Sequence, residues 1–132
     1  MSFWEKHEIT EIHRLREMLQ KAKIPYELWN RNVLLDPRQV TKDIDWGWQI
    51  LVYKEDGECL ISVVQGWGTY GYNADKLEIM GLLTPEESKM DGVAGWLTAD
   101  DVFQRIERYW KEHAQDAGNE GGNHGKTNPD RI

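Results

Sequence analysis

Two strand-like segments joined by a tight turn constrain the fold of this chain more than any other feature. WGWQILVY at 46–53 and CLISVVQ at 59–65 are rich in aromatic and β-branched residues, which favour strands. The linker between them has Asp56-Gly57 at its centre, a pair that supplies the two positive-φ residues of a type I′ turn. The sequence therefore predicts a β-hairpin whose register pairs position 53 with 60, 52 with 61, 50 with 63 and 48 with 65.

This register divides the hairpin into two faces that are both largely apolar. The better candidate for the core is the face that carries Trp48, Ile50, Val52, Ile61 and Val63. The other face carries Leu51, Tyr53, Leu60, Ser62 and Val64. Because strands that are apolar on both faces are typical of buried positions, we expect the hairpin to be central, with other elements packed on each side.

Helices are predicted at both ends of the domain, with further strands between them. Residues 5–23 repeat apolar side chains at three- and four-residue steps, and Pro25 ends this pattern. A second amphipathic helix opens at a Thr98 cap, and Thr84 opens a short helix before it. Segments 26–35 and 77–83 are the other predicted strands. The expected fold class is α+β: an antiparallel three- to four-stranded sheet with an N-terminal and a C-terminal helix.

Length and composition predict one domain followed by a tail. The chain has 132 residues, which suits a single core. We expect a single α+β domain over residues 1–113 and a flexible tail over 114–132, because GNEGGNHGKTNPDRI is rich in Gly and Asn and almost free of apolar residues.

The cellular setting is read from cysteine usage and from apolar runs. Cys59 is the only cysteine, so an internal disulfide is excluded. The first residues, MSFWEKHEITEIH, lack the apolar stretch of a signal peptide, and no run is long enough for a membrane span. We therefore expect a cytoplasmic location and no membrane association.

Sequence motifs for catalysis, metals and cofactors fail on inspection of their context. Gly66-x-Gly68-x-x-Gly71 matches the letters of a dinucleotide fingerprint. That fingerprint needs a helix directly after it in a parallel unit, whereas the strand-like LEIMG follows here. A sharp bend with crowded neighbours explains these glycines better.

Other chemistries fare no better. His7-Glu8 begins a zinc-protease motif, but position 11 is Glu and not His. The sequence contains no Gly-x-Ser-x-Gly, and its acidic pairs lie in first helical turns, where the helix dipole favours carboxylates. We predict no catalytic residue, no metal ligand and no cofactor.

The glycine-aromatic loop at 66–72 is the best candidate for a binding site. Aromatic rings beside a few polar groups suit a pocket for a planar ligand or a protein hot spot. The alternative is that these rings pack the edge of the sheet. The predicted ligand- or partner-binding residues are Trp67, Thr69, Tyr70, Tyr72, Asn73 and Trp48. Trp46 and Gln65 are further candidates for stacking and hydrogen bonding.

The formal net charge of −7 narrows the partners. Direct binding of nucleic acid is not expected, because it depends on Lys and Arg contacts with phosphates. A basic surface on a partner protein would be complementary, and simple solubility is the alternative explanation. Exposed aromatic side chains in so small a domain are also compatible with a homodimer.

Several runs together resemble a group of small uncharacterised proteins from bacteriophages and prophages of Gram-positive bacteria. They are LREML, IPY, SVVQGWGTYGY, LEIMGLLT and GWLTADDVFQRI, within residues 12–110. The resemblance implies a phage setting, in which small acidic proteins often act by binding, and it carries over no catalytic residue.

Three hypotheses about function remain open. The first is a non-enzymatic counter-defence inhibitor, similar to an anti-CRISPR protein, that occupies a basic surface of a host protein or nucleoprotein effector. The second is a sponge or sensor for a nucleotide signal that uses the aromatic loop. The third is an enzyme of unrecognised type.

Overall fold

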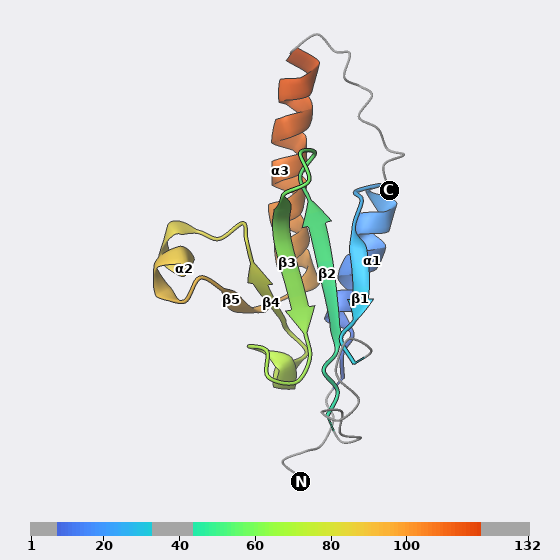
Figure 1. The fold of residues 1–132 in the computed structure, drawn as a ribbon, viewed down its shortest axis with the longest axis vertical. Coiled ribbons are helices and arrows are strands. Elements are labelled where there is room, and N and C mark those ends of the chain that lie inside the picture. The colour runs from blue at the N-terminus through green and yellow to red at the C-terminus, as the bar shows by residue number, and fades with distance from the viewer. Residues whose placement is uncertain (1–7, 33–43, 120–132) are drawn as a thin grey trace.

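The chain folds as a five-stranded antiparallel sheet with two helices on one face (Figure 1). This computed structural model describes residues 8–32 and 44–119. The strands lie in chain order: β1 (Glu27–Asn30), β2 (Trp48–Tyr53), β3 (Cys59–Gln65), β4 (Leu77–Met80) and β5 (Ala94–Leu97). The helices are α1 (Glu11–Lys21), α2 (Pro85–Met90) and α3 (Ala99–Asn119), with a short 3₁₀ helix, η2 (Tyr72–Ala74), before β4. The α+β prediction is confirmed, with five strands instead of three or four.

The additional strand is β5, which pairs with β4 through Leu77–Leu97 and Ile79–Ala94. It escapes sequence analysis because it is only 4 residues long and contains a glycine. Its backbone is also irregular, since Trp96 has a positive φ of 61°. No alternating pattern of apolar and polar residues is therefore present to reveal it.

The central hairpin has the predicted register along most of its length and a different turn. Gly57 N donates to Lys54 O at 3.0 Å, Lys54 N donates to Glu58 O at 2.8 Å, and Gly57 alone in the turn has a positive φ. This is a type I turn closed by a glycine bulge, so the type I′ prediction is wrong. Tyr53 consequently pairs with Cys59 and not with Leu60.

A second irregularity restores the predicted register. Leu60 is an extra residue in β3, because Tyr53 pairs with Cys59 while Val52 pairs with Ile61. Beyond this bulge the pairs 50–63 and 48–65 are as predicted. On the predicted core face, Ile50, Val52, Ile61 and Val63 are consequently fully buried and Trp48 is partly buried. Leu60, predicted for the opposite face, is buried in the core because of the bulge.

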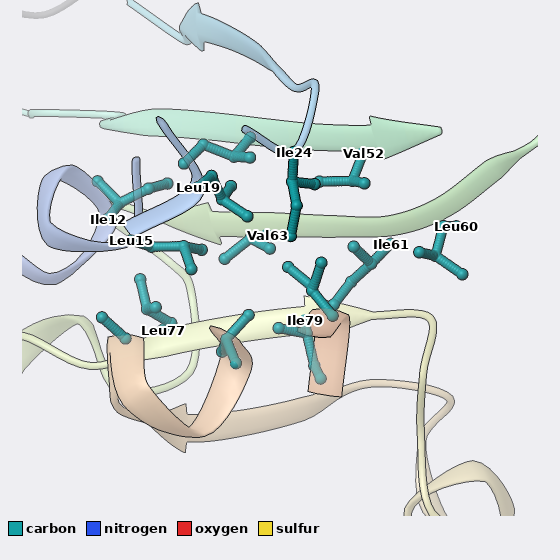
Figure 2. Packing of buried hydrophobic residues seen from close by; sticks show 14 of the residues in the cluster. Ile12, Leu15, Leu19, Ile24, Val52, Leu60, Ile61, Val63, Leu77 and Ile79 are labelled. Carbon is teal, nitrogen blue, oxygen red and sulfur yellow. The ribbon is translucent and has the colours of Figure 1, made fainter. Parts of the chain in front are cut away.

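The core lies between the sheet and the two long helices (Figure 2). Ile12, Leu15 and Leu19 of α1 form the buried stripe of that helix, and Val102 and Ile106 do the same in α3. Each fully buried aliphatic side chain of this kind contributes about 1.5–3 kcal/mol. Figure 1 shows α1 and α3 on one side of the sheet only, and no described helix lies over the other side. We expected other elements to pack on both faces of the hairpin. Among the described residues, helices cover one face only.

Helix α1 is shorter than the predicted 5–23, and residues 1–7 lie outside the described part of the chain. Its C-terminus is a Schellman motif: Lys23 has a positive φ of 59°, Lys23 N donates to Gln20 O, and Ile24 N donates to Leu19 O. Ile24 joins Leu19 in the core. The Schellman motif therefore ends the helix before Pro25 is reached.

Two other boundaries differ from the sequence predictions. Strand β1 ends at Asn30, and positions 33–35 of the predicted 26–35 strand lie outside the described residues. Helix α3 extends to Asn119, so the predicted domain boundary at 113 falls inside a helix. Residues 120–132 of the predicted tail are outside the described residues.

The predicted helix starts at Thr84 and Thr98 are both reciprocal caps. Thr84 Oγ1 accepts from Glu87 N while Glu87 Oε1 accepts from Thr84 N, and Thr98 exchanges the same bonds with Asp101. Glu87 also forms a two-pronged ion pair with Arg105 of α3, at 2.8 and 2.9 Å. The Arg105 guanidinium, followed by the Thr84 backbone bond, lowers the pKa of Glu87 to about 2. This pair fastens α2 to α3.

Candidate functional site

The uncovered face of the sheet carries several large apolar side chains that remain exposed. Alternation along the strands places Trp29, Tyr53 and Met80 on this face, opposite the buried side chains. Their exposed fractions are 42%, 37% and 59%, high for such large apolar groups. The other side chains of this face on β1 to β4 are Glu27, Gln49, Leu51, Ser62, Val64 and Glu78.

One end of this face is hollowed. The hollow has a volume of about 400 Å³, within the range of small-ligand sites. It reaches from the end of β1 across β2 and β3 to β4. It is lined by Arg31, Trp46, Gln49, Ser62, Val64, Trp67, Gly68, Thr69, Glu78 and Met80.

Close backbone contact positions the two tryptophans of the hollow. A Cβ on Gly47 would lie 1.8 Å from Gln65 O, and a Cβ on Gly66 would lie 2.0 Å from Trp46 O. Only glycine permits the two backbone segments that extend beyond the paired part of β2 and β3 to approach so closely. Trp46 and Trp67 consequently meet edge to face, with ring centroids 5.3 Å apart.

Polar side chains hold the segment before β2 against the end of β1. Asn32 Nδ2 donates to Asp45 Oδ1 at 2.9 Å, and Asn32 Oδ1 accepts from Trp46 N at 2.8 Å. Asp45 Oδ1 also accepts from Gly47 N at 2.9 Å. These bonds hold Trp46 beside Arg31, the residue that precedes Asn32.

Arg31 is the cation of the hollow. Its backbone N donates to Gly47 O at 2.8 Å, and its Nη1 donates to Trp46 O at 3.3 Å. Within residues 8–32 and 44–119, no carboxylate oxygen lies within ion-pairing distance of the guanidinium. A guanidinium has five N–H donors, so most of the hydrogen-bonding capacity of Arg31 is unused by these residues.

The remaining polar groups of the lining form hydrogen bonds with one another and with the neighbouring backbone. Gln49 Nε2 donates to Ser62 Oγ at 2.9 Å, and Thr69 Oγ1 bonds to both Gly66 N and Gly66 O. Glu78 Oε1 accepts from Tyr70 N at 2.8 Å. The titratable side chains of the lining are Arg31 and Glu78, and no histidine belongs to it. Stacking, hydrogen bonding and ion pairing are what this arrangement can do.

The structure separates the residues predicted for binding. Trp67 and Thr69 line the hollow, and Tyr70 lies beside it, half exposed. Tyr72 is buried in η2, whereas Asn73 is exposed. Trp48 lies on the covered face, where its ring meets the His13 ring at 5.1 Å. The earlier candidate Trp46 lines the hollow.

Gln65, the other earlier candidate, belongs to a buried structural network. Its Oε1 accepts from Ile12 N at 3.0 Å and its Nε2 donates to Asp75. Asp75 Oδ1 also accepts from Thr10 N and Glu11 N, and its Oδ2 accepts from Thr10 Oγ1. Partial burial acts to raise the pKa of Asp75, but these hydrogen bonds together lower it below its usual value. The loop after β3 thus caps α1.

Sequence reasoning missed most of the hollow. With the register known, alternation places Gln49, Ser62, Val64, Glu78 and Met80 on the uncovered face, although it does not single out that face as a site. Arg31 had no signal, because it follows a short strand and its contact with Trp46 depends on tertiary structure.

No group of three or more His, Cys, Asp or Glu side chains in the described part of the chain could hold a metal ion. None of the helices in that part is both long enough and apolar enough to cross a membrane. Comparison with protein-family models, with curated proteins and with solved structures gave no match.

Proposed function

We propose that this protein is a non-enzymatic binding protein that docks on a partner protein through the uncovered face of its sheet. The observation that carries the proposal is the combination of Trp29, Tyr53 and Met80, all more than a third exposed, on one face of a folded sheet. Exposed apolar groups gathered on one surface mark interaction sites, and aromatic residues dominate the binding energy at such sites.

Part of this face is held in place before any partner arrives. Trp29 Nε1 and Tyr53 OH both donate to Glu27 Oε1, at 3.2 and 3.1 Å. One carboxylate therefore orients two aromatic rings on neighbouring strands. Rings that are already ordered lose less conformational entropy on binding, which favours affinity.

The partner that suits this face is a protein with a positively charged surface. Carboxylates border the apolar groups: Glu27 on β1 and Glu78 on β4. The chain as a whole carries −7 charges. Charge complementarity would speed the encounter with a basic groove and disfavour acidic partners.

The resemblance to phage proteins supports a more specific form of this proposal. The protein would be a counter-defence inhibitor of the anti-CRISPR kind, occupying the nucleic-acid-binding groove of a host effector in the host cytoplasm. The acidic border would take the place of the phosphates, and the aromatic face would supply the contact that does not depend on salt.

The experiment is affinity capture from a Gram-positive host lysate, followed by binding measurements with each purified candidate at low and high salt. Met80→Asp should weaken binding strongly, whereas Met90→Asp should not, because Met90 is 78% exposed on α2 and not on this face. Trp29→Ala tests the face outside the hollow. Binding that is indifferent to salt, or equal loss from the Met80 and Met90 variants, would overturn the proposal.

A further inference from the structure

We infer that the hollow at the end of the uncovered face is a binding site for a nucleotide, with the base over β2 and β3 beside the Trp67 loop and the phosphate on Arg31. This ligand is a small molecule, so the inference goes beyond the proposed docking of a protein. It assigns a role to Arg31, which no sequence motif indicated.

Arg31 is a cation without a counterion among the described residues. Arg31 Nη1 donates one hydrogen bond to Trp46 O, at 3.3 Å, and no carboxylate of the described residues forms an ion pair with the guanidinium. Arg105, by contrast, donates three hydrogen bonds, two to the Glu87 carboxylate and one to Leu82 O. A planar guanidinium with free donors matches phosphate geometry, and Arg is favoured wherever phosphate must be bound in a fixed orientation.

Two indole rings, of Trp46 and Trp67, form walls of the hollow. Trp46 and Trp67 meet at an interplanar angle of 73°, so they form two walls of a corner and do not stack on each other. Both line the hollow together with Arg31. Nucleobases stack on aromatic side chains with an affinity that tolerates differences in sequence.

Gln49 and Ser62 provide hydrogen-bonding groups on the floor of the hollow. The bond from Gln49 Nε2 to Ser62 Oγ leaves the Gln49 Oε1 acceptor and the Ser62 hydroxyl proton without a partner among the described residues. An acceptor beside a donor is complementary to the edge of a base. Adenine suits this edge, because its amino group can donate to Gln49 Oε1 while its ring nitrogen accepts from the Ser62 hydroxyl.

The order of the strands separates the two ends of the ligand. Arg31 follows β1, whereas Glu78, the carboxylate of the lining, lies on β4 with β2 and β3 between. Glu78 Oε1 is already occupied by Tyr70 N. A phosphate on Arg31 is therefore kept from Glu78 by the width of the base, which lies over Ser62 and Val64.

The test is a titration of the full chain with AMP, GMP, CMP and UMP, in which binding is measured by calorimetry and by tryptophan fluorescence. Adenosine and inorganic phosphate, each alone, report the contributions of the base and the anion. We expect at least one nucleotide to bind, and adenosine and phosphate each to bind roughly tenfold more weakly or worse, since charge-assisted hydrogen bonds to Arg are among the strong ones. Failure of all four nucleotides at millimolar concentration would overturn the inference.

Matched variants locate the site. Arg31→Ala should weaken the nucleotide roughly tenfold or more and leave adenosine unchanged, and Arg31→Lys should recover only part of the loss because the fork is gone. Arg108→Ala, an exposed arginine of α3, is the control. Trp67→Leu should abolish binding while Trp67→Phe retains part of it, provided thermal melts show both variants folded. Equal effects from Arg31→Ala and Arg108→Ala would place the ligand elsewhere.

The two proposals fail separately. Trp29 does not line the hollow, so Trp29→Ala should weaken a protein partner without changing nucleotide affinity. Arg31→Ala should weaken nucleotide binding without changing the affinity for a protein partner. A chain that binds nucleotides equally well with and without Arg31 defeats this inference alone.

Discussion

Replacement of Asp75 tests whether the loop after β3 holds α1 in place. Its carboxylate receives four hydrogen bonds, from Thr10 N at 2.8 Å, Glu11 N at 3.2 Å, Gln65 Nε2 at 2.5 Å and Thr10 Oγ1. Asp75→Ala removes all of them at once. It also leaves Gln65, whose side chain is fully buried, without an acceptor for its amide.

The magnitude follows from these separate losses. Loss of a helix cap costs about 0.5–2 kcal/mol, and an unsatisfied buried donor costs about 1–3 kcal/mol. The losses overlap, so we expect Asp75→Ala to lower the free energy of unfolding by about 2–4 kcal/mol. For a domain of this size, that corresponds to a decrease in Tm of roughly 10 °C.

Asp75→Asn is the matched variant that separates hydrogen bonding from charge. Asp75 has a φ of 55°, and Asn tolerates this left-handed conformation as well as Asp does. The amide oxygen can keep the three bonds of Oδ1, and the amide nitrogen can donate to Thr10 Oγ1. We expect a loss of about 1 kcal/mol or less, since most hydrogen bonds survive.

The pH dependence adds an independent readout. Because the pKa of Asp75 in the folded state is lowered, its contribution is complete above the usual aspartate pKa and is lost as the pH falls through the folded value. Wild-type protein should therefore lose stability below about pH 4 through this group, and the Asn variant should not. Urea unfolding monitored by tryptophan fluorescence at pH 7, 4 and 3 measures both effects. An Asn variant as unstable as the Ala variant, or an Ala variant within about 0.5 kcal/mol of wild type, would refute the reasoning.

Three further perturbations have definite expected results. Glu87→Gln should lower the free energy of unfolding by about 1–2 kcal/mol at pH 7, measured by chemical denaturation, because it removes the charge that pairs with Arg105. The pKa of Glu87 is lowered to about 2 in the folded protein. The stabilisation by this pair should therefore be complete in the wild type above about pH 4.5 and should disappear as the pH falls toward 2. Gly66→Ala should cost about 2–4 kcal/mol, because its Cβ meets backbone, and more than Gly68→Ala, which has open space but a positive φ; equal thermal melts would contradict this. Trp46→Phe should leave the free energy of unfolding within about 1 kcal/mol of wild type, because the buried Trp46 Nε1 lacks an acceptor among the described residues and its removal offsets the lost ring area; a loss above about 2 kcal/mol would show that this N–H has a partner.

The fold was predictable where local patterns and tertiary packing agree. The hairpin, its buried face and the caps at Thr84 and Thr98 follow from alternation and from capping chemistry. The turn type does not, because Asp-Gly suits a type I′ turn and also a type I turn with a glycine bulge. The extra residue Leu60 compensates for that choice, so a wrong turn still led to the correct central register.

The candidate site was predictable only in part. Composition pointed to Trp67 and Thr69, which do line the hollow, but it grouped them with Tyr72 and Trp48, which the fold buries or turns to the other face. For Tyr72, proximity in sequence was misleading, because the loop changes direction between Trp67 and Tyr72. Trp48 lies on β2, and the strand turns its side chain to the covered face. Arg31 lies more than thirty positions from Trp67 in the sequence, so only the assembled sheet brings the two together.

The chain-order sheet implies a sequence of events in folding. Each strand pair joins neighbours along the chain, so the sheet can grow hairpin by hairpin with small losses of loop entropy. The helical layer is different, because α1 must meet α3 across almost the whole domain, and Glu11 Oε1 accepts from Ala99 N over a separation of 88 residues. We expect substitutions at that junction mainly to accelerate unfolding, and those in the β2–β3 hairpin to slow folding, which would make the docking of α1 on α3 the late step.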